Sequence, residues 1–417
     1  MGYDHSGPDG CINGSGYDHS GPDGCIRELF SEDDRQDHQA EAAQQEHARA
    51  ANLDAGVDDP TAGSVSLGKP RPSAPGPQGC SDSGHADQKG QKAKTESPRR
   101  LAEHWPPSIH QLGFRPVARI LLLGSTGFFG RGVAHKLIDN GHQLRVLVRD
   151  PMKAAAFKVR GAQVVVGDAL DPAALKQSSQ GTEHIISLVA VRRNQPQSYL
   201  AVNVDGPRIM AEAAKAAGVK SVVLVSVIGA RLDRNYKYLT SRWMGEQELA
   251  KSGVAGTILR FSLVLAEEGG ALVDFERQAN FGPFIIIPGG GQAHMQPILR
   301  EDAARCVVET IGRPELLGKI VELGGPEVVT VEAVIDWFLQ ARGIKKRKLK
   351  VPVPLLLPGA AIMETLLKDP IITPDEINTL QLDNIAAGID SVSSNYGWRP
   401  TAASSWTPAN WTKKTGR

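Results

Sequence analysis

The sequence predicts an α/β protein built on a doubly wound parallel sheet, with a smaller C-terminal subdomain and a disordered N-terminal tail. Three observations support this prediction. A continuous apolar run leads into a glycine-rich turn and then into a helical stretch, at 118–138. Further strand-like runs alternate with helical stretches, which is the order that places strands side by side and parallel. The first quarter of the chain, in contrast, holds few apolar residues.

The predicted tail, residues 1–115, contains only 14 Val, Ile, Leu, Met, Phe and Trp residues, together with 15 Gly and 10 Pro. So little apolar surface does not offset the entropy lost when a chain becomes ordered, so we expect disorder. The tail carries 18 acidic and 11 basic residues, whereas the remaining 302 residues carry 28 and 36. The net charge of +1 is therefore the sum of a tail at −7 and a body at +8, and it indicates nothing about partners.

Targeting and redox chemistry are also constrained by composition. No run of 18 or more apolar residues occurs, and the N-terminus lacks the apolar segment of a secretory signal. The first 50 residues hold 11 acids and 3 bases, the reverse of an Arg-rich mitochondrial transit peptide. Of the four cysteines only Cys306 lies in the body, which suits a reducing compartment. We expect a soluble or peripheral protein and favour the cytoplasm.

The tail contains a duplicated segment. Gly2–Ile12 reads GYDHSGPDGCI and is repeated without change at Gly16–Ile26. Each copy holds one His and one Cys, a combination that could bind a metal, but the spacing does not bring two ligands to one face of a turn. We favour a flexible duplication and assign no metal ligands. Farther on, Lys69–Arg100 is rich in Pro, Gly, Ser and Lys and is typical of a linker.

The body opens with the pattern of a dinucleotide site. Ala118–Gly124 is a continuous apolar run, as expected of a strand buried on both faces of a sheet. Gly124 would make a tight turn, Gly127 would let backbone N–H groups approach a pyrophosphate, and Gly130 would allow the helix to pack closely on the strand. The predicted phosphate-binding turn consists of Gly124, Ser125, Thr126, Gly127, Phe128, Phe129 and Gly130.

The next two strands carry residues that would choose the cofactor. Gln143–Val148 should end at the adenosine ribose, where a carboxylate selects NAD and an Arg accepts a 2′-phosphate. Arg149 comes first, so we favour NADP(H). In the alternative, NAD(H) binds, Arg149 is a solvated charge, and Asp150 takes the ribose hydroxyls. After the strand Gln163–Val166, Asp168 either accepts from the adenine amino group or caps the following helix.

The remaining elements continue the same alternation. Strand-like runs occupy His184–Val189, Ser221–Val225 and Thr257–Arg260, and helical stretches lie at 172–179, 197–217 and 240–252. This order predicts a parallel sheet with its ligand at the carboxyl ends of the strands. Nothing in the chain resembles a nucleic-acid-binding module, so we expect no nucleic-acid partner.

A candidate catalytic set follows the fifth predicted strand. Ser226 comes directly after it, Tyr238 twelve residues later, and Arg242 one helical turn beyond the tyrosine. This is the layout of short-chain dehydrogenases, in which Tyr is the acid or base, Ser orients a carbonyl, and a Lys lowers the pKa of the Tyr. Here Arg242 replaces that Lys. Hydride transfer and a bound cofactor without turnover both remain open.

The body resembles an atypical, extended short-chain dehydrogenase in four segments: GSTGFFGRGVAHKLIDNGHQLRVLVRDPMKA, VVVGDALDP, AVNVDGPRIMAEAAKAAGVKSVVLVSVIGA and YLTSRWMGEQELAKSGVAGTILR. More narrowly, FGPFIIIPGGGQAHMQPI, GKIVELGGPEVVT and ITPDEINTLQLDN are similar to the NADPH-binding accessory subunit of respiratory complex I and its bacterial relatives. Relatives often have Leu-Arg-Pro-Ser where this chain has Leu-Arg-Phe-Ser, at 259–262.

The resemblance implies roles for individual residues. The three glycines of the turn would hold the pyrophosphate, and Arg149 the 2′-phosphate. Asp168, with Ala169 beside it, would meet the adenine, and Val189 and Ala190 would line the nicotinamide side. It also implies a structural NADPH that marks assembly. We divide the body into an NAD(P)-binding Rossmann domain at 116–345 and a C-terminal subdomain at 346–417 that completes the cleft.

The C-terminal part contains a basic run and an apolar stretch. Residues 345–350 read KKRKLK and are followed by VPVPLLL and further apolar residues to 367. One interpretation is a peripheral membrane contact through 345–367, with bases toward acidic headgroups, which would place the protein at the inner membrane. The other is a solvated charge run before a helix that packs over the substrate cleft.

Three functional hypotheses follow. The leading one is an NADP(H)-binding protein of the complex I accessory family, with a role in assembly, stability or quinone-linked chemistry of a membrane-associated respiratory complex. The second is an active NADP-dependent reductase or a nucleotide-sugar epimerase or dehydratase. The third is a regulator that senses the NADP(H) ratio.

Overall fold

The computed structural model describes residues 117–194, 197–266, 269–280, 282–367 and 370–405. The predicted disordered tail, with its duplicated segment and its linker, lies outside the described residues, and nothing in the structure tests those predictions.

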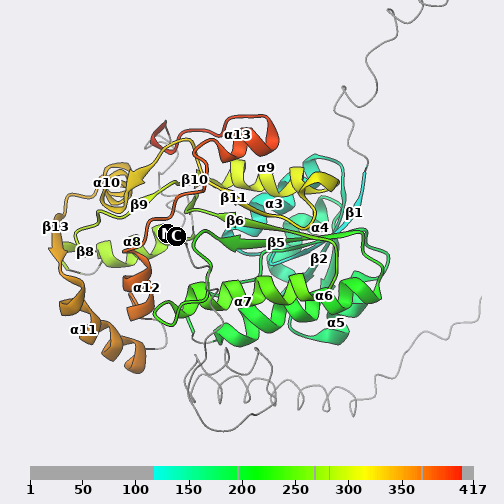
Figure 1. Cartoon of the computed structure of the whole chain (residues 1–417), viewed down its shortest axis with the longest axis horizontal. Coiled ribbons are helices and arrows are strands. Elements are labelled where there is room, and N and C mark those ends of the chain that lie inside the picture. Colours follow the sequence, from blue (N-terminus) through cyan, green and yellow to red (C-terminus); the bar gives the residue numbers. More distant parts are fainter. Residues whose placement is uncertain (1–116, 195–196, 267–268, 281, 368–369, 406–417) are drawn as a thin grey trace, which may run out of the picture. The chain divides into compact units, whose positions relative to one another are not determined.

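Seven parallel strands form the main sheet, in the order β3-β2-β1-β4-β5-β6-β11 (Figure 1). The predicted doubly wound parallel sheet is confirmed. The strands are β1 (Arg119–Leu123), β2 (Gln143–Val148), β3 (Gln163–Val166), β4 (His184–Ser187), β5 (Ser221–Val227), β6 (Gly256–Phe261) and β11 (Ile320–Leu323).

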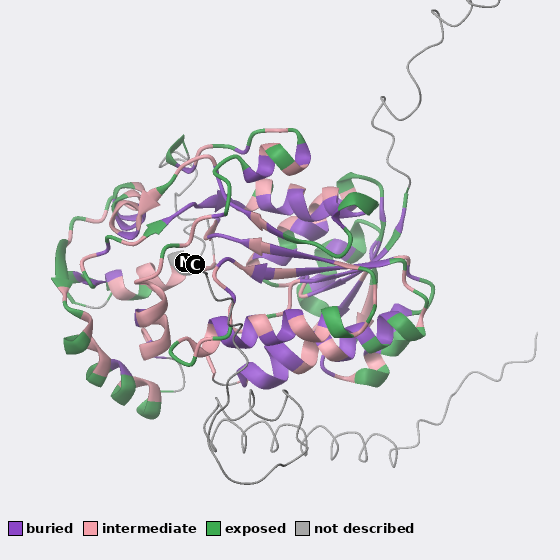
Figure 2. Cartoon of the chain, in the orientation of Figure 1, coloured by how far each residue is buried: buried purple, intermediate pink, exposed green. Residues whose placement is uncertain are grey.

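Helices cover both faces of this sheet, so its central strands are buried on both sides (Figure 2). Along β1, Ile120 and Leu122 contribute to one apolar core and Leu121 and Leu123 to the other. The first core is covered by α3 (Phe128–Asp139), α4 (Ala155–Val159), α9 (Arg300–Thr310) and α13 (Ser391–Tyr396). The second is covered by α5 (Pro172–Ser179), α6 (Gly206–Ala216) and α7 (Lys237–Lys251). Burial on both faces explains why the strands read as continuous apolar runs.

Several predicted boundaries were wrong. Ser226 lies within β5 instead of after it, because pairing with β6 continues through Val227. The helix predicted at 197–217 is a π-helical segment, η4 (Leu200–Asp205), followed by α6, which begins beside Pro207. The seventh strand, β11, was not predicted, because its four residues IVEL carry a charge and give no clear periodicity.

A second group of elements lies beyond the carboxyl ends of β5 and β6. It contains β7 (Val264–Leu265), α8 (Ala271–Asn280), β8 (Phe284–Pro288), β9 (His294–Met295), β10 (Ile298–Leu299), β12 (Val329–Thr330), α10 (Val331–Ala341), β13 (Arg347–Val351), α11 (Val353–Leu366) and α12 (Pro374–Thr379). Short 3-10 segments complete the described chain: η3 (Pro151–Ala154), η5 (Pro314–Leu316) and η6 (Ala403–Ser405). β8 pairs with β13, β7 with β10, and β9 with β12. A third apolar core in this group includes Leu265, Ile285, Ile287, Val334 and Phe338.

None of the described helices is long and apolar enough to span a bilayer.

A buried glutamine joins this group to the main sheet. Gln296 is fully buried, and its side-chain amide donates to the carbonyls of Gly325 and Ile389, at 2.6 and 2.8 Å. Its Oε1 atom accepts from the backbone N–H of Ala386 at 3.0 Å. Its own N–H donates to Ser262 Oγ, directly after β6. The side-chain amide therefore satisfies backbone groups of two segments that are far apart in sequence, near 325 and at 386–389, and the backbone N–H adds a link to Ser262.

We predict that Gln296→Leu lowers the free energy of unfolding by about 3 kcal/mol, because the Gly325 carbonyl and the Ala386 N–H would be left buried without partners. Urea unfolding measures this change. The matched control is Gln292→Leu, at an exposed position whose amide contacts a neighbouring turn carbonyl, where we expect a change within about 0.5 kcal/mol. Equal effects of the two substitutions would contradict a bridging role for Gln296.

Candidate functional site

The glycine-rich turn has the backbone geometry that the sequence predicts. Gly124 has a φ of +80°, a conformation that L side chains rarely adopt. A Cβ atom at Gly130 would lie 2.0 Å from the Gly124 carbonyl oxygen, so α3 packs directly on the end of β1. Gly127 is the N-cap of α3 and supplies no side-chain cap, and the first turn of the helix contains no acidic residue. The first N–H groups of α3 are therefore free to bind an anion.

A cleft of about 800 Å³ lies at the carboxyl ends of β1 to β4. Eight of the predicted cofactor residues line it: Gly124, Thr126, Gly127, Arg149, Asp168, Ala169, Val189 and Ala190. Ser125, Phe128, Phe129 and Gly130 do not, and all but the partly buried Phe128 are buried. The lining also includes residues that sequence reasoning missed: Leu147, Val148, Gly167, Leu170, Leu188, Val191, Gln197 and Val202. Only their place in the sequence could have indicated that they line the cleft, because most of them lie beside the ends of the predicted strands.

Two adjacent residues at the end of β2 behave differently. Arg149 is exposed at the edge of the cleft, and its side chain makes no hydrogen bond or ion pair with any described residue. Asp150 caps the following 3-10 turn, because its Oδ1 atom accepts from the Met152 N–H at 3.0 Å. Asp150 is also absent from the cleft lining. The Arg149 guanidinium is therefore available at the cleft, whereas the Asp150 carboxylate accepts a hydrogen bond from the backbone.

Asp168 lines the cleft at the end of β3. Its Oδ1 atom accepts from the Leu170 N–H at 2.9 Å, which closes a local turn. The N-cap of α5 is Asp171, which accepts from the Ala173 N–H at 3.0 Å. The alternative that Asp168 caps this helix is therefore wrong.

The three candidate catalytic residues do not converge on one cavity. Tyr238 lies in the first turn of α7 and lines an apolar cavity, but Ser226 and Arg242 line neither this cavity nor the cleft. The buried Ser226 hydroxyl has no hydrogen-bond partner among the described residues. Arg242 is also buried, and its guanidinium donates to the Val225 carbonyl on β5.

Electrostatics at Tyr238 oppose ionisation. Burial raises the pKa of the Tyr238 hydroxyl above its ordinary value, and the guanidinium groups of Arg242 and Arg192 offset only part of this effect. Burial also lowers the pKa of Arg242, although Tyr238 and Glu246 act in the opposite direction. The net direction is upward, opposite to the lowering expected where a Lys activates the tyrosine of a short-chain dehydrogenase.

The chain's departure from the Leu-Arg-Pro-Ser pattern has a packing explanation. Phe261, at the position of the Pro, is buried edge-on against Phe129 of α3, with ring centroids 5.6 Å apart. On either side of it, Arg260 forms a two-point ion pair with the fully buried Glu246 of α7, at 3.0 and 2.6 Å, and Ser262 Oγ donates to the Asn384 carbonyl. This segment therefore fixes α3, α7 and the C-terminal chain around the site.

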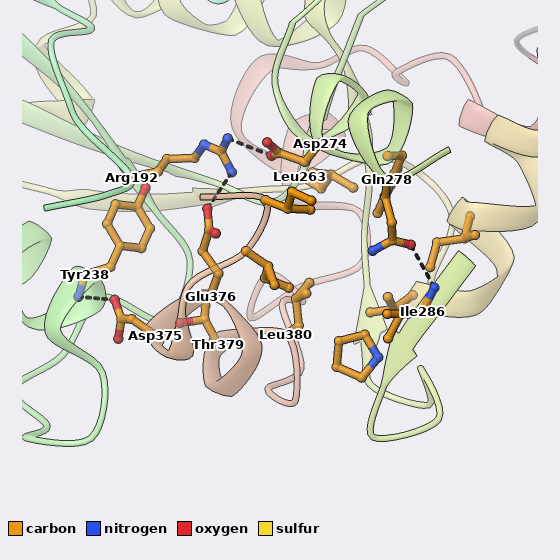
Figure 3. Close-up of a pocket in the computed structure, with 16 residues that line it drawn as sticks. Arg192, Tyr238, Leu263, Asp274, Gln278, Ile286, Asp375, Glu376, Thr379 and Leu380 are labelled. Atoms are coloured by element: carbon orange, nitrogen blue, oxygen red, sulfur yellow. Dashed lines mark hydrogen bonds and ion pairs between the residues drawn. The ribbon is translucent and has the colours of Figure 1, made fainter. Parts of the chain in front are cut away.

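The apolar cavity has a volume of about 980 Å³ and lies beside Tyr238, between α7, α8, α10, α12 and β8 (Figure 3). Its apolar lining consists of Leu263, Phe275, Ile286, Pro288, Val331, Ile335, Ile371, Ile372 and Leu380. Its polar lining consists of Arg192, Tyr238, Asp274, Gln278, Asp375, Glu376 and Thr379. Sequence reasoning missed these residues, apart from Tyr238, because they come from distant segments.

Residues 124–314 match the NAD(P)H-binding family model. The photosystem II assembly factor Ycf39 of Guillardia theta is 24% identical over 290 residues, which cover 67% of this chain and 89% of that protein. Subunit 9 of the NADH dehydrogenase (ubiquinone) 1 alpha subcomplex of Mus musculus, a mitochondrial protein, is 28% identical over 247 residues, covering 57% and 63%. The NADPH-dependent quinone oxidoreductase QOR2 of Escherichia coli, solved with NADPH, superposes with a TM-score of 0.54 at 23% identity, covering 68% and 96%.

These matches define the class of the protein: it contains an NAD(P)-binding Rossmann-like domain. Its homologues include Ycf39 and complex I subunit 9, so the predicted resemblance to the complex I accessory subunit family is confirmed. The likeness to the quinone oxidoreductase shows the shared fold.

We predict that Gly130→Ala lowers the free energy of unfolding by about 2 kcal/mol and weakens dinucleotide binding, because its Cβ would force α3 away from the Gly124 carbonyl. Chemical denaturation and NADPH titration measure the two effects. Gly132→Ala is the control on the same helix, where the atoms nearest to the new Cβ would belong to the flexible Arg300 side chain and not to the backbone. That variant should keep its affinity and gain up to about 1 kcal/mol from helix propensity. A loss of affinity in both variants would contradict the assignment.

Proposed function

We propose that this protein binds NADP(H) as a structural or regulatory cofactor, with little or no turnover, and acts in the assembly or stability of a membrane-associated respiratory complex. The observation that carries this proposal is the position of Arg242. Its guanidinium donates to the Val225 carbonyl of β5 and offsets only part of the rise in the Tyr238 pKa, which argues against the full activation that Lys gives the tyrosine of short-chain dehydrogenases. The raised pKa of Tyr238 supports the same conclusion.

The residues present fit a dinucleotide. The uncapped start of α3 and the glycine turn suit a pyrophosphate, since a side chain at Gly124 or Gly130 would meet backbone atoms there. Arg149, which has no partner among the described residues, suits a 2′-phosphate, and Asp150 is already used as a cap. This contrast favours NADP(H) over NAD(H). The nicotinamide would supply hydride chemistry if a substrate were turned over.

A cofactor can be retained for stability alone. A ligand that binds only the native state stabilises it by mass action, about 2.7 kcal/mol at a ligand concentration of 100 times Kd. The cleft is lined by segments after four different strands, so an occupied cleft would hold those segments together. A protein built in this way suits a part of a larger assembly, as its relatives' names, an assembly factor and a complex I subunit, suggest for them.

A peripheral membrane contact through 345–367 is part of this proposal. Leu355, Ile362 and Leu366 of α11 are 72%, 60% and 76% exposed, and Ala360 is the buried residue of this helix. Of the preceding bases, Lys348 and Lys350 are paired with Glu332 at 2.7 Å each. The apolar face of α11 therefore supports a contact with an inner membrane more strongly than the basic run does.

We predict that Arg149→Ala weakens NADPH binding by about tenfold or more and leaves NADH binding unchanged, because one charge-assisted hydrogen bond to the 2′-phosphate is worth about 1.5–3 kcal/mol. Titration of nucleotide fluorescence measures both affinities. Lys153→Ala removes a nearby exposed base that does not line the cleft, and it should change neither affinity. Equal losses for NADPH and NADH in Arg149→Ala would contradict the assignment of the 2′-phosphate.

A reductase is the second candidate, because Tyr238, the predicted acid, lines a largely apolar cavity with a few polar groups. Under our proposal, NADPH oxidation with quinones or aldehydes is no faster in the wild type than in Tyr238→Phe. A reductase that uses Tyr238 as its acid would lose about a hundredfold or more in this variant. NADPH-dependent thermal stabilisation of both proteins is the control for folding and cofactor binding.

A further inference from the structure

The apolar cavity beside Tyr238 is separate from the dinucleotide cleft. The two share no lining residue, although the chain passes directly from Val191 in the cleft to Arg192 in the cavity. Most of the cavity lining is aliphatic or aromatic, with a few polar groups among it. This composition is typical of small-molecule sites. A ligand of this cavity is therefore a second ligand, beyond the dinucleotide of the proposed function.

The charges around the cavity exclude an anionic ligand. Arg192 is the one cation among the lining residues, and it binds Asp274 at 2.8 Å and Glu376 at 3.4 Å (Figure 3). Asp375 adds a further carboxylate, which accepts from the backbone N–H groups of Lys237 and Tyr238. A nucleotide sugar needs free cations for its diphosphate, whereas Arg192 and the neighbouring Arg193 are already paired with Asp274 and Glu376. The geometry thus disfavours the epimerase hypothesis.

Two hydroxyl groups remain available among the lining side chains. The Tyr238 hydroxyl makes no hydrogen bond with a described residue, and the Thr379 Oγ1 atom is buried without a partner. Gln278, in contrast, uses its Oε1 atom to accept from the Ile286 N–H at 2.9 Å. A buried hydroxyl without a partner costs free energy, which a hydrogen bond to a ligand would recover. Such a ligand needs an uncharged acceptor oxygen.

The cavity also reaches an apolar part of the surface. Ile286 lines the cavity and is 37% exposed, and in the β8–β13 pair it lies opposite Leu349, which is 46% exposed. Phe284, two residues before Ile286, is 43% exposed. A molecule with an apolar chain could therefore lie partly in the cavity and partly along this edge.

We propose that this cavity binds an uncharged lipophilic molecule with a carbonyl or hydroxyl oxygen, which lies between the hydroxyls of Tyr238 and Thr379. A quinone with an alkyl tail and a neutral acyl lipid share this chemistry. The site fits either one and excludes phosphorylated or carboxylated ligands.

The test uses the full chain with NADPH present and measures binding by calorimetry and thermal shift. The probes are decylubiquinone, monoolein, palmitate and UDP-glucose. We expect binding of decylubiquinone, monoolein or both, which identifies the source, and no binding of palmitate or UDP-glucose. Binding of UDP-glucose, or of neither uncharged probe, would overturn the proposal. NADPH binding is measured separately, so failure of this site is distinguishable from failure of the proposed function.

Two variants localise the site. Thr379→Val keeps the side-chain shape and removes the unpartnered hydroxyl. It should raise the unfolding midpoint of the protein without ligand and lower the affinity for the probe about threefold to tenfold. Leu380→Trp fills the cavity and should weaken binding by about tenfold or more. The control Val159→Ala alters an exposed side chain of α4 outside both cavities and should leave affinity unchanged. Unchanged affinity in both cavity variants, with NADPH binding intact, would place the probe elsewhere and refute the assignment.

Discussion

The parallel direction of the seven strands determines where every candidate site lies. Parallel strands end at one edge of the sheet, so the loops after β1 to β6 meet there. Those after β1, β2, β3 and β4 surround the dinucleotide cleft. Residues after β4, β5 and β6, namely Arg192, Tyr238 and Leu263, line the apolar cavity. One topological constraint therefore produces two neighbouring cavities with different chemistry.

Buried polar links hold the second group of elements and α7, which line the apolar cavity, against the sheet. Gln296 satisfies backbone groups of segments near 325 and 386–389. The ion pair of Arg260 with the fully buried Glu246 fixes α7, which carries Tyr238, onto β6. A buried polar group that loses its partner destabilises the folded state. These links therefore favour one specific arrangement of the elements.

The sheet and the glycine turn could be predicted from the sequence because both depend on local patterns of residues. Continuous apolar runs predicted six of the seven strands, and the conformations of Gly124 and Gly130 follow from their place between strand and helix. Ser226 was placed outside β5 because strand ends depend on pairing with β6, which is not local. The cavity was missed for the same reason: Ile371, Ile372 and Leu380 meet Tyr238 only through long-range contacts.

The segment after β4 connects the two cavities physically. Val189, Ala190 and Val191 line the cleft, and Val191 is held by two hydrogen bonds of 2.9 Å to the buried Asn203 side chain. The next residues, Arg192 and Arg193, bind carboxylates of α8 and α12 at the mouth of the apolar cavity. Residues adjacent in the chain cannot move independently. A displacement of Val191 in the cleft wall would therefore also displace Arg192 and Arg193 and disturb their ion pairs. The ion pairs at the rim of the apolar cavity are therefore positioned by the wall of the dinucleotide cleft.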